Sequence, residues 1–112
     1  MQKEIDTLIQ AIKTDYINWT TNNGTKEMSS YSQGVVDSME DNIQVKEEGK
    51  KYIKIIRENS VWGFISKVDF KHFRKGDILK AAGWNAPALN APRGNILDGG
   101  YTVRWTGPLY LN

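Results

Sequence analysis

The sequence is better equipped for binding than for catalysis. Aromatic faces stack on nucleobases, and ammonium and guanidinium groups bind phosphates. Three of the four tryptophans, Trp62, Trp84 and Trp105, lie in the second half of the chain, which also holds most of the basic residues. We therefore expect a site for a nucleotide-like anion there. Its candidate residues are tryptophans, cations and asparagines: Lys80, Trp84, Asn85, Asn90, Arg93, Asn95 and Arg104.

The same residue types have a purely structural explanation. Large aromatic side chains usually fill the core of a small domain, and this explanation is favoured for Trp62 and Trp105 and stays open for Trp84. Asparagines supply hydrogen bonds in turns, and Arg93 would then cap a carbonyl group.

Catalytic groups are few. His72 is the only imidazole, and Asp69 is the only carboxylate near it in the sequence. The environment of His72 is basic, which is typical of a solvated loop histidine. A hydrolase that uses only Asp77 and Asp98 is the remaining catalytic alternative. We expect no enzyme activity, no catalytic residues and no cofactor.

Metal sites and disulfides are also not expected. The chain has no cysteine and a single histidine, and its acidic residues do not follow the spacing of a calcium loop. No apolar run approaches the roughly 20 residues that span a bilayer, and the first residues lack the apolar stretch of a signal peptide. The sequence favours a protein without a membrane segment, in the cytoplasm.

The two halves of the chain carry opposite charge. Residues 1–48 hold four basic and nine acidic residues, a net charge of −5, whereas residues 49–112 hold eleven basic and four acidic residues, a net charge of +7. This asymmetry indicates either an anion-binding face on the second half or acidic helices that complement a basic sheet.

Helices are predicted in the first part of the chain. Residues 3–20 carry apolar side chains at the spacing of one helix face, namely Ile5, Leu8, Ile9, Ile12, Tyr16 and Trp19. Asn22, Asn23 and Gly24 end this helix, because Asn and Gly adopt left-handed conformations readily. A second helix is predicted from a Thr25 cap to about Met39, with an apolar face of Met28, Tyr31, Val35 and Met39.

Strands are predicted in the second part. The period changes to two at Ile43, and β-branched and aromatic residues are enriched at residues 51–57, 60–66, 78–79 and 101–105. In the last of these strands Arg104 points away from Val103 and Trp105, and Gly107-Pro108 ends the strand. This order predicts a single α+β domain over residues 1–112, with one or two N-terminal helices (1–41) packed on a small antiparallel sheet of three to five strands (42–112).

Residues 83–100 have no helix or strand period. A loop of this length in a small domain is usually functional or disordered, and interspersed apolar residues favour order. We expect an ordered, packed loop in which Trp84, Leu89 and Ile96 favour burial and which presents its polar residues, Asn85, Asn90, Arg93 and Asn95.

Several short motifs in the second half carry a resemblance. In order, they are KYIKI (51–55), SVWGFI (60–65), KGDILKAAGWNAPA (75–88), RGNI (93–96) and GPLYL (107–111). Together they resemble small uncharacterised proteins of tailed bacteriophages. The resemblance implies a phage origin and an infected bacterial cytoplasm as the place of action.

Three functions are compatible with the sequence. The leading hypothesis is a non-enzymatic phage-type binding protein that inhibits a host or defence component, either by sequestering a nucleotide-like anion or by masking a host protein. The second is a nucleic-acid-binding protein that uses the basic half, and the third is a structural or assembly subunit that forms homo-oligomers.

Overall fold

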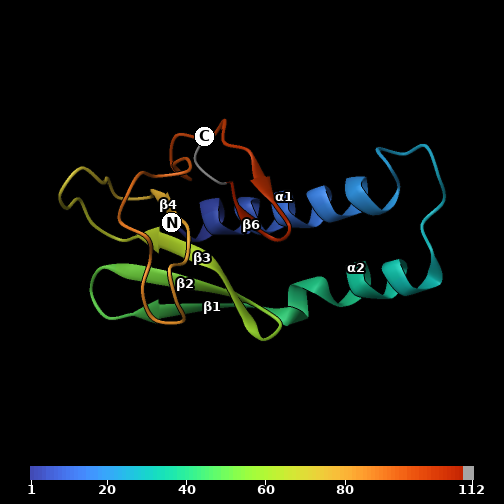
Figure 1. Ribbon diagram of the computed structural model, residues 1–112, viewed down its shortest axis with the longest axis horizontal. Helices are drawn as coiled ribbons and strands as arrows, with labels where there is room; N and C mark the ends of the chain where they lie inside the picture. The colour runs from blue at the N-terminus through green and yellow to red at the C-terminus, as the bar shows by residue number, and fades with distance from the viewer. Residues whose placement is uncertain (110–112) are drawn as a thin grey trace.

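The computed structural model describes residues 1–109 and shows two helices on an antiparallel sheet (Figure 1). The molecule is elongated, measuring 45 × 26 × 25 Å. Its helices and strands are α1 (Gln2–Thr20), α2 (Ser30–Asn42), β1 (Ile43–Glu48), β2 (Tyr52–Arg57), β3 (Ser60–Ser66), β4 (Ile78–Leu79), β5 (Val103–Arg104) and β6 (Gly107–Pro108). The predicted α+β class is confirmed. Tyr110 to Asn112, and with them the end of the GPLYL motif, lie outside the described residues.

Helix α1 packs on the sheet through the face that its apolar spacing predicts. Ile5, Leu8, Ile12 and Tyr16 are buried, and they join a core with Ile53, Ile55 and Ile65 of the sheet. Burial of each such side chain contributes about 1.5–3 kcal/mol. Trp19, near the C-terminal end of this face, is an exception, and Figure 1 shows that this end of α1 extends past the sheet. The side chain of Trp19 is 63% exposed.

Helix α2 begins later than predicted, at Ser30 and not near Thr25. The Ser29 side chain caps it by accepting a hydrogen bond from the Ser32 N–H at 3.1 Å, which is the usual role of an N-cap serine. Its buried face is also different, since Ser32, Val36 and Met39 are buried while Tyr31 is 80% exposed. The small Ser32 side chain lets the two helices approach, and the Thr20 hydroxyl lies 2.7 Å from its Oγ.

The main sheet has the strand order β1-β2-β3-β4, and all neighbouring strands are antiparallel. One face carries the core shared with the helices. The other face holds a second apolar cluster of Phe64, Phe73 and Leu79. Both faces of the central strands are therefore covered, which explains the near-continuous burial of β2 and β3.

Strands β5 and β6 form a hairpin beside α1, where a single strand over residues 101–105 was predicted. Gly107 and Pro108 do not end the strand but pair with it, and the edge position of β6 tolerates the proline. Two contacts hold the hairpin to β3. The Trp62 indole N–H donates to the Arg104 carbonyl at 2.9 Å. Pro108 packs closely against Gly63, where any larger residue would place its Cβ only 3.0 Å from the proline ring.

The long loop after β4 is fixed by backbone hydrogen bonds to that strand and its flanks. Ala88 donates to Lys80, Arg93 to Ile78 and Ile96 to Gly76, over 2.7 to 2.9 Å. Of the three side chains predicted to be buried, only Ile96 is, since Trp84 and Leu89 are 52% and 43% exposed. Backbone pairing thus orders this segment with little side-chain burial. Within residues 1–109 no helix has the length and apolar character needed to cross a bilayer.

Candidate functional site

Two aromatic rings of α1 meet a third ring from the β5–β6 turn near the C-terminal end of α1. The Tyr16 and Trp105 rings pack edge to face with centroids 5.1 Å apart, and the Trp19 and Trp105 centroids are also 5.1 Å apart. Trp105 is partly buried and Trp19 is exposed. The cluster therefore has one anchored ring and one ring with a free face.

The β5–β6 turn positions Trp105. Its backbone N–H donates to Asp15 Oδ2 on α1 at 2.9 Å, and the Arg57 guanidinium carbon lies 4.8 Å from the centroid of its ring. A cation over an indole face is attractive. Residues from α1, β2 and the β5–β6 hairpin are thus held in one arrangement.

A hollow of about 400 Å³ opens beside the two indoles, and we call it the tryptophan groove. Its lining residues are Asp15, Asn18, Trp19, Asn22, Asn23, Arg104, Trp105 and Thr106. This volume lies within the range of small-ligand sites. In the described part of the chain, the side chains of Asn18, Asn22, Asn23 and Arg104 make no hydrogen bond or ion pair with other residues.

The backbone at one end of the groove is unusual. Asn22 and Asn23 have φ angles of 49° and 56°, and Gly24 follows with 86°. The predicted left-handed end of α1 is confirmed, and it directs two successive asparagine residues to the groove. Left-handed asparagine costs less than other non-glycine residues, but two in a row still store strain.

The groove combines an aromatic surface, a cation and several amides. An exposed indole stacks on a planar ring, and a guanidinium binds phosphate or carboxylate oxygens in a fork. Amide side chains donate and accept at once, so they match the edges of a nucleobase. The groove therefore provides the chemistry for a planar, hydrogen-bonding ligand with a negative charge.

Of the predicted candidates, Arg104 alone lines this groove. Its side chain is exposed, as the alternation in residues 101–105 predicts. The other six lie elsewhere, and they are not gathered into one pocket.

Trp84 and Asn85 cover a buried lysine that was not among the candidates. Lys54 of β2 is 2% exposed, its ammonium donates to Asn85 Oδ1 at 3.0 Å, and it lies 5.0 Å from the Trp84 ring centroid. These contacts stabilise a buried charge, which is a sufficient structural role for both residues.

The backbones of Lys80 and Arg93 take part in the hydrogen bonds between the β4 region and the long loop. The Lys80 ammonium donates to the Pro108 carbonyl at 3.2 Å. Arg93 does not cap a carbonyl, since its Nε and Nη1 are buried without a hydrogen-bond partner among residues 1–109. This burial lowers the pKa of the Arg93 guanidinium.

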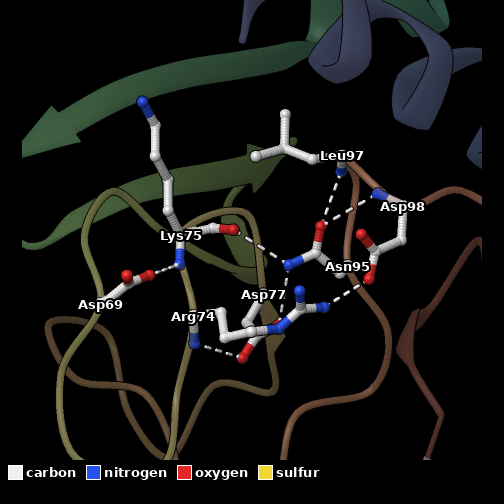
Figure 2. Close-up of polar contacts among 7 residues, drawn as sticks. All are labelled: Asp69, Arg74, Lys75, Asp77, Asn95, Leu97 and Asp98. Carbon is white, nitrogen blue, oxygen red and sulfur yellow. Dashed lines mark hydrogen bonds and ion pairs between the residues drawn. The ribbon is translucent and has the colours of Figure 1, made fainter.

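Asn95 is buried, contrary to the expectation that the loop exposes it (Figure 2). Its Nδ2 donates to the Lys75 carbonyl and to Asp77 Oδ1, both at 2.9 Å. Its Oδ1 accepts from the N–H groups of Leu97 and Asp98. Asn90 is also a turn residue, with its Oδ1 on the Ala91 N–H at 2.8 Å.

The possible catalytic residues line one open hollow of about 450 Å³, which includes His72, Arg74, Asp77, Asp98 and Tyr101. Asp77 is 3% exposed and accepts from Asn95 and from the Arg74 N–H. Asp98 pairs with the Arg74 side chain, and this hydrogen bond raises the pKa of the guanidinium (Figure 2).

His72 of this hollow and the nearby Asp69 are likewise engaged. His72 Nε2 lies 2.7 Å from the Asn90 carbonyl, and Asp69 accepts from the Lys75 N–H and does not orient the imidazole. Burial raises the pKa of the Tyr101 phenol. The contacts of His72 and Asp69 hold loops together. No group of three or more potential metal ligands occurs in residues 1–109.

A model of the family of unknown function DUF7717 matches residues 1–110. The chain belongs to this family. The match includes both helices, and so extends beyond the motifs of the second half that carry the phage resemblance. No curated protein and no solved structure matches the chain.

Within this DUF7717 chain, sequence reasoning missed most of the groove. Trp19 fits the apolar spacing of α1 and was predicted to be buried. Asn18, Asn22 and Asn23 resemble ordinary helix-end residues. A signal does exist in the sequence, because the three asparagines and Trp19 fall within six residues. The position of the β5–β6 hairpin in the fold then brings Arg104 beside them.

Proposed function

We propose that this chain is a non-enzymatic binding protein that sequesters a nucleotide-like anionic ligand in the tryptophan groove. The observation that carries the proposal is the meeting of the exposed Trp19 indole and the Arg104 guanidinium in one groove, with three asparagine side chains that have no partner within residues 1–109. The phage resemblance further suggests a ligand or signal of an infected bacterial host.

Each part of such a ligand has a matching group. The base stacks on the free face of Trp19, and the phosphate binds the exposed Arg104 side chain. The amides of Asn18, Asn22 and Asn23 pair with the base edge. Asp15 Oδ2 accepts from the Trp105 N–H, and the second oxygen, Oδ1, is available to accept from a ribose hydroxyl, a common partner of carboxylates.

Binding without turnover follows from the same residues. Among residues 1–109, the groove is lined by no histidine, and its only carboxylate, that of Asp15, accepts a hydrogen bond from the Trp105 backbone. Chemistry on a bound nucleotide needs a positioned base or a metal, and the groove supplies neither a second carboxylate nor a lysine. These groups support sequestration of the ligand rather than its turnover.

The test is calorimetric titration of the full chain with adenosine 5′-monophosphate. Trp19→Ala and Arg104→Ala are each expected to weaken binding by about tenfold or more, from the lost stacking and the lost charged hydrogen bonds. Trp84→Ala and Arg74→Ala are the matched controls, since they remove an exposed tryptophan and an exposed arginine elsewhere. Absence of binding, or equal losses in all four variants, would overturn the proposal.

A second candidate function is the masking of a host protein by the adjoining surface. Tyr31 is 80% exposed, and with Trp19, Trp105 and Arg57 it borders another hollow of about 330 Å³. Trp, Tyr and Arg dominate the binding energy of many protein interfaces. Tyr31→Ala separates the two functions, because it removes protein capture from a host lysate but leaves the affinity for adenosine 5′-monophosphate unchanged.

A further inference from the structure

The tryptophan groove continues along α1 into a second hollow. This hollow measures about 310 Å³ and shares Asp15 and Asn18 with the groove. Its other lining residues are Ala11, Thr14, Tyr101, Thr102 and Val103. The two hollows are therefore two ends of one cleft between α1 and residues 101–106.

The hydrogen bond from the Trp105 N–H to Asp15 fixes how the two walls align. Residues 101–103 lie beside Ala11 and Thr14, and Trp105 and Thr106 lie beside Asn18 and Asn22. Nine residues of helix separate Ala11 from Thr20, where α1 ends, and at 1.5 Å per residue this wall of the cleft is roughly 14 Å long. A single nucleotide fills only part of that length.

The chemistry of the cleft changes along its length. One end has the exposed Trp19 ring and the asparagine amides, and the other has the Thr14 and Thr102 hydroxyls and the Tyr101 side chain. Arg104 lines the end with Trp19, and in the chain it follows directly on Thr102 and Val103 of the other end. Thr102 and Arg104 are both exposed and flank the buried Val103.

We propose that the cleft binds a dinucleotide, with one base on Trp19, the second nucleoside against Tyr101 and Thr102, and the internucleotide phosphate on Arg104. This inference rests on the proposed function and specifies its ligand. A cation between two ring sites matches the order of groups in a dinucleotide, which is base, phosphate, base. A mononucleotide leaves the second hollow unused.

The experiment compares adenosine 5′-monophosphate with the dinucleotide adenylyl-(3′→5′)-adenosine by calorimetric titration of the full chain. We expect the dinucleotide to bind about tenfold more tightly or better, from the additional ring contact. Thr102→Trp fills the second hollow and should abolish this gain. Thr14→Leu obstructs it from the opposite wall at a helix position that tolerates leucine, so the test remains if one variant fails to fold.

The outcomes separate the two proposals. Equal affinity for the two compounds overturns the dinucleotide assignment and leaves the sequestration function standing. An unchanged gain in both Thr102→Trp and Thr14→Leu also overturns it, because the second nucleoside must then lie elsewhere. Binding of neither compound overturns both proposals.

Discussion

Two regions of this molecule contain the same kinds of polar residue but use them differently. Around Asn95, an asparagine, two aspartates and an arginine bond to one another and to the backbone of the loops. In the tryptophan groove, three asparagines and an arginine point outward, and within residues 1–109 their side chains have no internal partner.

The two regions differ in the partners of their polar side chains, which are protein groups around Asn95 and solvent or a ligand in the groove. Buried polar groups must be satisfied inside the protein, so a fully bonded asparagine is a structural element. Exposed polar groups that gather beside an uncovered indole are satisfied by water, and a ligand replaces that water readily. Residue composition alone does not separate these two cases.

The largest expected effect is that of Asn95→Ala. This change removes four hydrogen bonds and leaves the buried Asp77 short of a donor, so we expect a loss of about 3 kcal/mol in the free energy of unfolding. Urea denaturation followed by circular dichroism measures it. Asn18→Ala is the matched control and should change the value by less than about 0.5 kcal/mol. Similar losses in the two variants would erase the distinction between the regions.

A smaller effect is expected for Asp15→Ala, because Asp15 belongs to the groove yet also supports the fold. Loss of the acceptor for the Trp105 N–H should cost about 1–2 kcal/mol and change the near-ultraviolet signal of the tryptophans. Asp15→Asn keeps an acceptor oxygen and should lose less. A signal unchanged in Asp15→Ala would show that this hydrogen bond does not position Trp105.

Asn22→Gly should separate binding from stability. Glycine adopts the observed φ of 49° without strain, so the free energy of unfolding should stay within about 0.5 kcal/mol. Affinity for adenosine 5′-monophosphate should fall several-fold, since the amide is lost. If the affinity is unchanged, Asn22 is a turn residue like Asn90 and not a groove residue.

The smallest effect concerns Glu40, an exposed contact between the helices. Its carboxylate accepts from Gln10 at 2.7 Å and from Lys13 at 3.5 Å, and these contacts lower its pKa below the ordinary 4.5. A lowered folded-state pKa contributes stability above pH 4.5 that is lost as the pH falls further. The urea midpoint of Glu40→Gln should therefore decline slightly less than that of the wild type below that pH. A steeper decline in Glu40→Gln would contradict this sign.

The elements were predictable where burial governs the pattern. The apolar spacing of α1 and the β-branched and aromatic residues of β2 and β3 predicted the fold class, because all three elements face the core. The start of α2 was missed because the serine-rich stretch offers several caps, and only the contact between Thr20 and Ser32 selects the buried face.

The groove was less predictable, because it depends on long-range contacts. Trp19 and Trp105 are far apart in the sequence. They are brought together by the hydrogen bonds of Trp62 to Arg104 and of Trp105 to Asp15, and by the packing of Tyr16 and Arg57 on the Trp105 ring. Asn95 failed as a candidate for the opposite reason, since a loop asparagine looks exposed until its four partners are known.

The most direct test of the account is a map of amide and indole NMR shifts during titration with adenosine 5′-monophosphate. We predict that the shifts concentrate in residues 15–23 and 101–106, including the indole N–H of Trp19, while residues 74–77 and 93–98 stay unchanged. Shifts centred on the Asn95 network with an unperturbed Trp19 would contradict the assignment of binding to the tryptophan groove.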